Sequence, residues 1–298
     1  MNASSAISID TAGEASSLTP AQMGIIADIA REDAGLTLPE AKRMMVQSRL
    51  ARRMRTVGCR GFDDYIKLLT SSPDAEERRA LISVLTTNVT SFFREAHHFE
   101  TLRTQVLPGL LREARRGSRI RLWSAGCSTG EEPYSLAMLI TALEPKAADL
   151  DIRILATDID PKVLTTAKQA VYEAASLATL PDFYEKTLKA TRESDGRLVM
   201  PQTVRRLVTF RQLNLHAAWP MKGRFDAILC RNVLIYFDFA HQSALWPRFR
   251  ACLDPEGWLF LGHSERIHPI DTSGFVQTGV TTYRRTDARP VGTPERED

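Results

Sequence analysis

Between residues 118 and 262 the chain alternates short apolar runs with helical segments, and this alternation restricts the fold more than any other feature. Four runs are typical of buried strands: IRLWSAG, IRILATD, FDAILCR and GWLFLGH. Helical segments are expected between them at 131–143, 161–170 and 241–252. Strands that alternate with helices form a parallel sheet whose ligands bind beyond the carboxyl ends of the strands. We therefore predict an α/β domain over residues 118–288.

One stretch, roughly residues 172–210, interrupts the alternation. It contains two β-prone runs, SDGRLVM and RRLVTF, and a turn signal precedes the first. We expect a small antiparallel β insert here. Gly196 is the only glycine of its loop, and Arg192 and Glu193 stand before it.

Residues 18–88 show helical periodicity alone. Four apolar stripes predict four helices, and Gly58 stands where the C-cap of the second is expected. Ser72-Pro73 supplies a cap and a first-turn proline for the fourth. The chain is therefore predicted to begin with an all-α domain, followed by a linker and connecting helix at 89–117.

Composition limits the classes of function. An apolar content of 43% and a charged content of 25% are ordinary for a globular protein, and the net charge of +3 is too small to predict a partner. No run of about 18 uncharged apolar residues is present, so no membrane insertion is expected. Because the four cysteines form no C-x-x-C pair, we expect neither zinc nor a disulfide framework, and a cytoplasmic location. The ends, 1–17 and 289–298, are predicted to be disordered tails.

The loop GCSTGEEPY follows the first apolar run and opens a helix. A glycine turn at a helix N-terminus attracts anions, but Glu131 and Glu132 would repel a phosphate. A phosphate-free ligand with an adenosine-like body and a cationic head suits the loop, and S-adenosylmethionine is such a ligand. Gly126 would let the backbone approach it, and a carboxylate would pair its ammonium. The alternative is an ordinary strand-to-helix turn.

Asp158 ends the next strand run, RILAT. A carboxylate at this position is placed to accept both hydroxyls of a ribose, as the acidic residue of dinucleotide folds does. The alternative is that Asp158 only caps the helix that begins near Pro161.

Five stretches resemble the chemotaxis receptor glutamate O-methyltransferases, the CheR family: LTTNVTSFFREAHHF, WSAGCSTGEEPYS, ATDID, FDAILCRNVLIYFD and GWLFLGHSE. The resemblance covers residues 20 to 285. It implies an all-α domain, a Rossmann-like methyltransferase domain, S-adenosylmethionine as methyl donor and S-adenosylhomocysteine as product. The implied substrates are glutamates on the cytoplasmic methylation helices of transmembrane chemoreceptors.

The resemblance also implies roles for residues that match the family's motifs. It places Arg94 and Tyr236 near the transferred methyl group and Glu132 at the methionine end of the cofactor, with Glu131 left open as the alternative. The other implied cofactor-binding residues are Asn88, Thr90, Arg94, Asp158, Asn214, Leu215, Arg231 and Asn232.

The implied reaction needs no general base, because a glutamate of pKa about 4.3 is ionised at neutral pH. Arg94 is expected to position the substrate carboxylate, and the alternative is a structural salt bridge to Glu95 or another acid. His97 and His98 are adjacent, so on a helix they should point to different faces and not share a metal. No metal is predicted.

The run KRMMVQSRLARRMR carries six basic residues and no acid. Its arginines, Arg49, Arg52 and Arg53 above all, are interpreted as a contact surface for the acidic receptor segment; the alternative is a solvated helix face. Nucleic acid is disfavoured because no aromatic residue lies in the run to stack bases.

Two other functions stay open. A nucleic-acid base methyltransferase would carry a turn like N-P-P-Y where this chain has RNVLIY. A cofactor-binding regulator would be favoured by loss of Arg94 or Tyr236, and both are present.

We expect a monomer. The charged loop of the insert predicts weak or absent binding of a receptor tail peptide.

Overall fold

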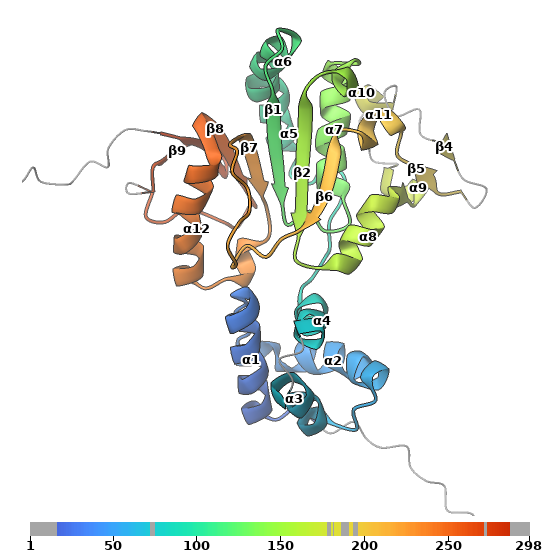
Figure 1. Ribbon diagram of the computed structural model, residues 1–298, viewed down its shortest axis with the longest axis vertical. Helices are drawn as coiled ribbons and strands as arrows, with labels where there is room; N and C mark the ends of the chain where they lie inside the picture. Colours follow the sequence, from blue (N-terminus) through green and yellow to red (C-terminus); the bar gives the residue numbers. More distant parts are fainter. Residues whose placement is uncertain are drawn as a thin grey trace, which may run out of the picture. The chain divides into compact units, whose positions relative to one another are not determined.

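The computed structural model contains two compact units, one made of the chain up to Asp33 and Thr37–Leu85, the other of Ala34–Leu36 and Thr86 onward (Figure 1). Within the described residues no helix is long and apolar enough to cross a membrane. The predicted tails, apart from Ser17, lie outside those residues. The structure describes residues 17–71, 75–177, 180, 182–185, 191–192, 196–270 and 273–286.

The first unit is helical, as predicted. Its helices are α1 (Pro20–Ala34), α2 (Arg43–Val57), α3 (Phe62–Ser71) and α4 (Ala75–Leu85), with a 3-10 turn η1 (Glu40–Lys42) before α2. Their apolar stripes form a buried core that includes Ile26, Leu50, Tyr65 and Leu81. Gly58 ends α2 with a φ of 76°, a left-handed conformation that glycine adopts without strain. The predicted Ser72-Pro73 cap lies outside the described residues.

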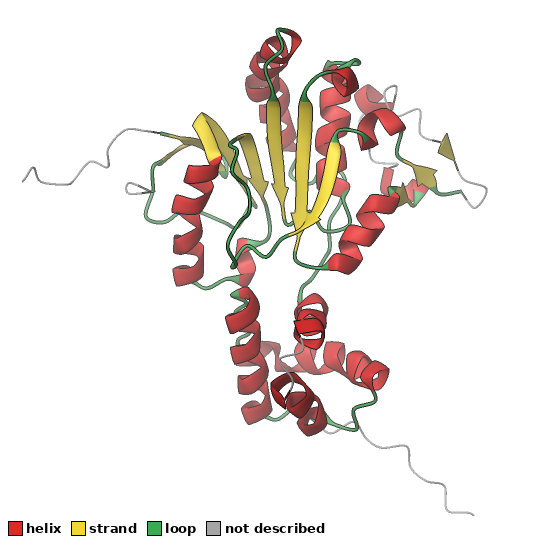
Figure 2. Ribbon diagram, in the orientation of Figure 1, coloured by secondary structure: helices red, strands yellow, loops and turns green. Residues whose placement is uncertain are grey.

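The second unit is built on a seven-stranded sheet with the order β6-β2-β1-β7-β8-β10-β9 (Figure 2). The strands from β6 to β8 are parallel, and β10 runs antiparallel to β8 and to β9. The strand order reverses between β1 and β7, where a parallel sheet leaves a crevice for ligands. The bounds are β1 (Ile120–Ala125), β2 (Ile152–Asp158), β6 (Val208–Gln212), β7 (Phe225–Cys230), β8 (Leu253–Leu261), β9 (Phe275–Gly279) and β10 (Thr282–Arg285).

Helices cover both faces of this sheet, which confirms the predicted α/β class. Successive strand residues point to opposite faces, so Leu122 lies in one buried cluster and Trp123 in the other. Helices follow β1, β2 and β7 at the positions expected from periodicity, as α7 (Glu131–Leu143), α8 (Pro161–Gln169) and α12 (Phe239–Cys252). The 3-10 turns η3 (Ala147–Asp149) and η4 (Leu234–Tyr236) complete the connections.

The connecting helix is divided by a π-helical turn, with α5 (Ala96–Thr101), η2 (Leu102–Val106) and α6 (Leu107–Arg115) in succession. Pro108 in the first turn of α6 explains the irregularity, since proline has no N–H to donate to the preceding turn.

The insert contains an antiparallel sheet of β3 (Val171–Tyr172), β5 (Leu198–Val199) and β4 (Thr191–Arg192), as expected. The interpretation of RRLVTF as part of it is wrong, because Val208–Gln212 is β6 and pairs in parallel with β2. Its main chain satisfies the outer edge of β2, which the short insert strands do not reach. Glu193 lies outside the described residues, as does the side chain of Arg192. Three short helices complete the insert: α9 (Ala174–Leu177), α10 (Asp182–Glu185) and α11 (Gln202–Arg205).

Candidate functional site

The glycine loop after β1 is a tight turn that only glycine fits at both ends. Gly126 has a φ of 87° and Gly130 a φ of 99°. A Cβ on Gly126 would overlap the side chain of Val233, and one on Gly130 would lie 2.7 Å from the hydroxyl of Tyr172. The loop therefore brings its backbone against the loop after β7, and α7 begins directly behind it at Glu131.

Asp158 fastens this loop to the end of β2. One carboxylate oxygen accepts a hydrogen bond from the Ser128 N–H at 2.8 Å, and the other accepts one from the Asp160 N–H at 3.0 Å. Burial raises the pKa of Asp158 although both N–H groups oppose the shift. Each oxygen keeps a second lone pair, so the carboxylate can still accept hydroxyl groups of a ligand. Asn88 lies beside it and donates to Asp160 at 3.2 Å.

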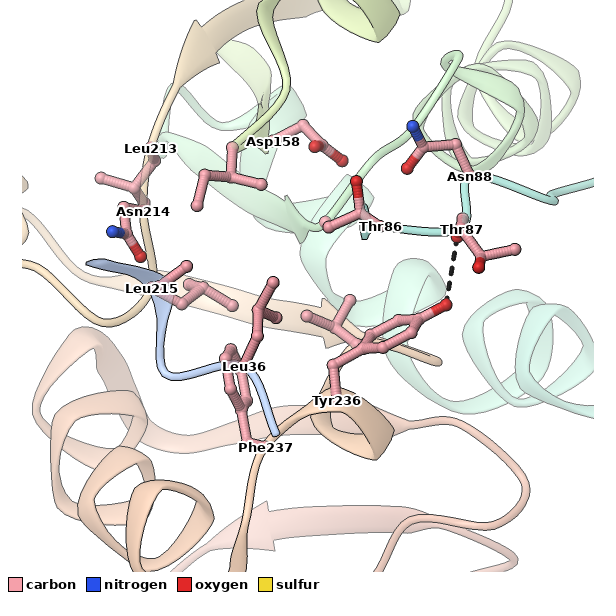
Figure 3. A pocket seen from close by; sticks show the side chains of 14 residues that line it. Leu36, Thr86, Thr87, Asn88, Asp158, Leu213, Asn214, Leu215, Tyr236 and Phe237 are labelled. Atoms are coloured by element: carbon pink, nitrogen blue, oxygen red, sulfur yellow. Dashed lines mark hydrogen bonds between the residues drawn. The ribbon is translucent and has the colours of Figure 1, made fainter. Parts of the chain in front are cut away.

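An apolar pocket opens beyond the strand ends (Figure 3). Leu36 and Phe237 form one wall, where they pair in an antiparallel bridge. Asn214 and Asp158 are its polar members on the strand side. The pocket can hold a flat, largely apolar body with a few hydrogen-bonding edges. Its lining residues are Ala34, Leu36, Thr86, Thr87, Asn88, Gly126, Asp158, Ile159, Leu213, Asn214, Leu215, Val233, Tyr236 and Phe237.

A polar pocket shares four residues with the apolar pocket, Thr87, Asn88, Gly126 and Asp158, so the two are neighbours. Both belong to the second unit. The polar pocket places cationic and anionic side chains around one space, which suits a ligand that carries both charges. The other residues lining it are Val89, Thr90, Ser91, Arg94, Ser128, Glu132, Arg231 and Asn232.

Glu132 and Asp158 are the two carboxylates that line the polar pocket. Glu132 accepts hydrogen bonds from the Ser124 hydroxyl at 2.7 Å and from Arg231 at 3.0 Å. Burial raises its pKa, and the charge of Arg231 opposes that shift. Glu131 lines neither pocket, and its carboxylate accepts a hydrogen bond from Thr129 at 2.7 Å instead.

Arg94 borders the polar pocket on the segment between Leu85 and α5. Its guanidinium donates to the Val89 carbonyl at 3.1 Å, which leaves further N–H groups for a ligand. Its own carbonyl accepts a hydrogen bond from Arg231. Tyr236 lines the apolar pocket, where its hydroxyl donates to the carbonyl of Thr87, a residue of both pockets, at 3.2 Å (Figure 3).

The structure thus gathers around two adjoining pockets all the predicted cofactor residues except Glu131. Sequence reasoning missed the apolar wall of Leu36, Val233 and Phe237. Val233 and Phe237 flank recognised motif residues, but nothing in the sequence around Leu36 connects it with a strand end more than a hundred residues away.

Glu265 was also missed. It is 4% exposed, and its carboxylate accepts backbone N–H groups of Gly262, Asn232, Leu234 and Ile235 at 2.6, 3.0, 2.7 and 3.3 Å. These bonds hold the turn after β7 that carries Arg231, Asn232 and Tyr236, and Asn232 has a φ of 59° there. The "HSE" stretch is the sequence signal that marks this residue.

His97 is exposed and His98 is buried, as expected of different faces, but the expectation that their ligand atoms lie too far apart to share a metal is wrong. Their ring centroids lie 4.1 Å apart, and one donor atom from each lies within 4.8 Å of the other and of a Glu95 oxygen. Both residues are in the first turn of α5, where side chains lean back toward the helix start. Glu95 already has a cation beside it, because Arg231 lies 3.2 Å away. The cluster is therefore charge-compensated without a metal.

The arginines of α2 differ from one another. Arg53 donates to Glu77 at 3.0 Å and Arg49 to the Leu85 carbonyl at 2.6 Å, so both are used within the helical unit. Arg52 and Arg55 are exposed. Of the three residues predicted to contact a partner, Arg52 is thus the one whose side chain points to solvent without a partner among the described residues.

Two family models match this chain. One is described as CheR methyltransferase, SAM binding domain, and matches residues 88–284; the other is CheR methyltransferase, all-alpha domain, and matches residues 22–86. A probable chemotaxis protein methyltransferase of Rhizobium etli is 47% identical over 85% of this chain and 96% of its own length. The chemotaxis protein methyltransferases of Klebsiella aerogenes and Escherichia coli are 41% and 39% identical, each over 89% of this chain and over 90% and 91% of their own lengths.

Proposed function

The chain belongs to the CheR family of S-adenosylmethionine-dependent chemotaxis methyltransferases, and from this premise we propose that it methylates glutamate side chains of chemoreceptors. The product is a glutamate methyl ester. The observation that carries the proposal is the polar pocket, in which a buried carboxylate, Glu132, and a cation, Arg94, border the same space. The first suits an ammonium group and the second a carboxylate substrate.

The residues of both pockets fit S-adenosylmethionine, which supplies an electrophilic methyl group when bound. Glu132 would pair with its ammonium, and Asp158 would accept hydrogen bonds from its ribose. The adenine would pack in the apolar pocket against Leu36 and Phe237, with Asn214 at its polar edge. No phosphate-binding group is needed, which agrees with the two acids at the start of α7.

Arg94 would hold the substrate carboxylate at the polar pocket. A glutamate is ionised at neutral pH, so its oxygen needs no base to become a nucleophile. Accordingly, the described residues that line the polar pocket include no histidine, cysteine or lysine. A planar guanidinium orients a carboxylate in two contacts, and this orientation lowers the entropic part of the barrier. Tyr236, which lines the adjoining apolar pocket and bonds Thr87 of both pockets, would limit the access of water.

Transfer of labelled methyl from S-adenosylmethionine to receptor membranes tests this function. We expect label on the receptor that is released as methanol in mild base, because carboxylate esters are base-labile. Receptor with alanine in place of its methylatable glutamates is the matched control and should stay unlabelled.

Two other outcomes would contradict the proposal. Base-stable label in nucleic acid would indicate a base methyltransferase. Cofactor binding without transfer to any receptor would indicate a regulator. The monomeric state, the cytoplasmic location and the weak binding of a receptor tail peptide stay predictions.

We further propose that the exposed side of α2 contacts the acidic receptor segment. Arg52 and Arg55 are the residues to replace, because Arg53 supports the helical unit through Glu77. Alanine at both positions should raise the KM for receptor, because each lost charge should weaken receptor binding by about 0.5–1 kcal/mol. It should also weaken the dependence of the KM on salt and leave cofactor affinity unchanged. Unaltered kinetics at every ionic strength would identify α2 as a solvated face.

A further inference from the structure

Glu95 is the centre of a buried polar cluster behind the polar pocket. Its side chain is 10% exposed. One oxygen accepts hydrogen bonds from the Asn232 side chain at 3.3 Å and from the His263 N–H at 3.1 Å. The other lies 3.2 Å from the guanidinium of Arg231 and 3.4 Å from Nδ1 of His98. Glu95 thus touches both residues that follow β7 at the candidate site.

These neighbours keep the Glu95 carboxylate ionised. Burial would raise its pKa, but the charge of Arg231 and the hydrogen bonds from His263 and Asn232 outweigh burial and bring the pKa to about 2. His98 stays neutral beside it, because burial and the charge of Arg231 lower its pKa to about 3. Glu95, Arg231 and Glu132 together carry one net negative charge, which favours a cationic ligand at Glu132.

The same cluster helps to hold the main-chain conformation around Arg94. Phe93 has a φ of 51° and Glu95 a φ of 56°, so Arg94 stands between two left-handed residues. This conformation is strained for a residue that is not glycine, and such strain persists only where the surroundings hold it. The Ser135 hydroxyl oxygen accepts a hydrogen bond from the Phe93 N–H at 2.9 Å on one side. Arg231 donates to the Arg94 carbonyl on the other.

We propose that Glu95 is a positioning residue of the methyl-transfer site, which holds Arg231 and Asn232 and through them presents Arg94 to the polar pocket. Glu95 does not line that pocket, so it acts through its neighbours. The inference rests on the proposed role of Arg94 toward a carboxylate substrate. It adds that the geometry of Arg94 depends on an anion on the next residue.

Glutamine is a sharp replacement for Glu95 because it has the same shape. The contacts from Arg231, Asn232 and the His263 backbone are all made by N–H donors. A glutamine must turn its own NH2 group toward one set of them, and donors facing donors repel. The change also leaves the buried guanidinium of Arg231 with a single acidic partner, Glu132.

The experiment compares Glu95→Gln with Glu100→Gln in the full chain. Glu100 lies on α5, the helix that Glu95 directly precedes, and pairs with Arg103 at the surface, so it controls for the loss of a nearby carboxylate. With saturating cofactor we expect Glu95→Gln to lower kcat about 10- to 100-fold. Amide hydrogen exchange should rise in residues 90–98, without a general rise across the sheet. A kcat within threefold of wild type, or unaltered exchange there, would overturn the proposal.

A double-mutant cycle separates positioning from a general structural defect. If Glu95 acts through Arg94, Glu95→Gln should lower the kcat of an Arg94→Lys variant by less than about threefold. Full additivity of the two effects contradicts the inference. If wild type itself transfers no methyl to receptor, the proposed function fails. Hydrogen exchange and S-adenosylhomocysteine affinity then still decide whether Glu95 orders the segment.

Discussion

The apolar and the polar pocket share residues but are built on different principles. The apolar pocket takes mostly neutral side chains from distant segments, such as Leu36, Leu215 and Phe237, and these offer a ligand apolar contact. The polar pocket takes charged side chains, and its Arg231 contacts both Glu132 of the pocket and Glu95 behind it. Asp158 belongs to both.

This difference shows how each pocket should respond to substitution. An apolar contact is lost in proportion to the area removed, and its neighbours can partly close the gap. A buried charge that loses its partner stays buried and uncompensated, so removing one residue also destabilises the charged residue that it contacted. We therefore expect large, coupled effects in the polar pocket and small, independent effects in the apolar one.

The largest effect should come from Glu132→Gln. The variant removes the proposed partner of the ammonium and half the charge balance of Arg231, so affinity for S-adenosylhomocysteine should fall by about 3–5 kcal/mol. Titration calorimetry measures it. Glu131→Gln is the control and should alter affinity less than about threefold, because Glu131 bonds Thr129 and lines neither pocket. Equal effects of the two changes would contradict the comparison.

Asp158→Ala should have the next largest effect, since Asp158 serves both pockets. Loss of the charge-assisted bonds to the ribose should weaken binding of S-adenosylhomocysteine by about 1.5–3 kcal/mol. Part of the loss should come from the loop, because Ser128 loses its acceptor. An affinity within threefold of wild type would remove Asp158 from the site.

Phe237→Ala should weaken cofactor binding by about 1–2 kcal/mol, through lost apolar contact with the adenine. The loss should be the same at low and high salt, whereas losses in the polar pocket should vary with salt. Ile235→Ala is a matched control, because Ile235 is 49% exposed and does not line the pocket. A loss at Phe237 that varies with salt would contradict the expected difference between the two pockets.

The smallest effect concerns pH. Burial raises the pKa of Glu132, so the group begins to take up a proton above the ordinary range of a glutamate. The proposed ammonium contact needs the ionised form, and affinity should therefore fall as pH decreases toward that raised pKa. We expect affinity to fall between pH 7.5 and 5.5, and to fall less in Glu132→Gln. An equally steep loss in that variant would assign the titration to another group.

The sequence by itself determined the order and type of the main elements. Periods of two and of 3.6 residues separated the strands from the helices, because each element must bury one face. The GCSTGEEPY loop and Asp158 follow from the same rule, since both come directly after strands whose carboxyl ends share one edge of the sheet. Local chemistry, as at Gly58, needed no tertiary information.

Only the tertiary structure decided which elements and side chains pair. RRLVTF is equally suited to an insert or to the main sheet, and the free edge of β2 selected the latter. The sequence predicted that Arg49 and Arg53 belong to a free contact surface. In the structure Arg49 donates to the Leu85 carbonyl and Arg53 to Glu77.

The same holds for the residues behind the site. Leu36, Glu95 and Glu265 act through contacts with residues from 30 to about 200 positions away, and no local pattern encodes such contacts. A buried polar atom must find a partner wherever the fold supplies one, and that partner is known only once the chain is folded.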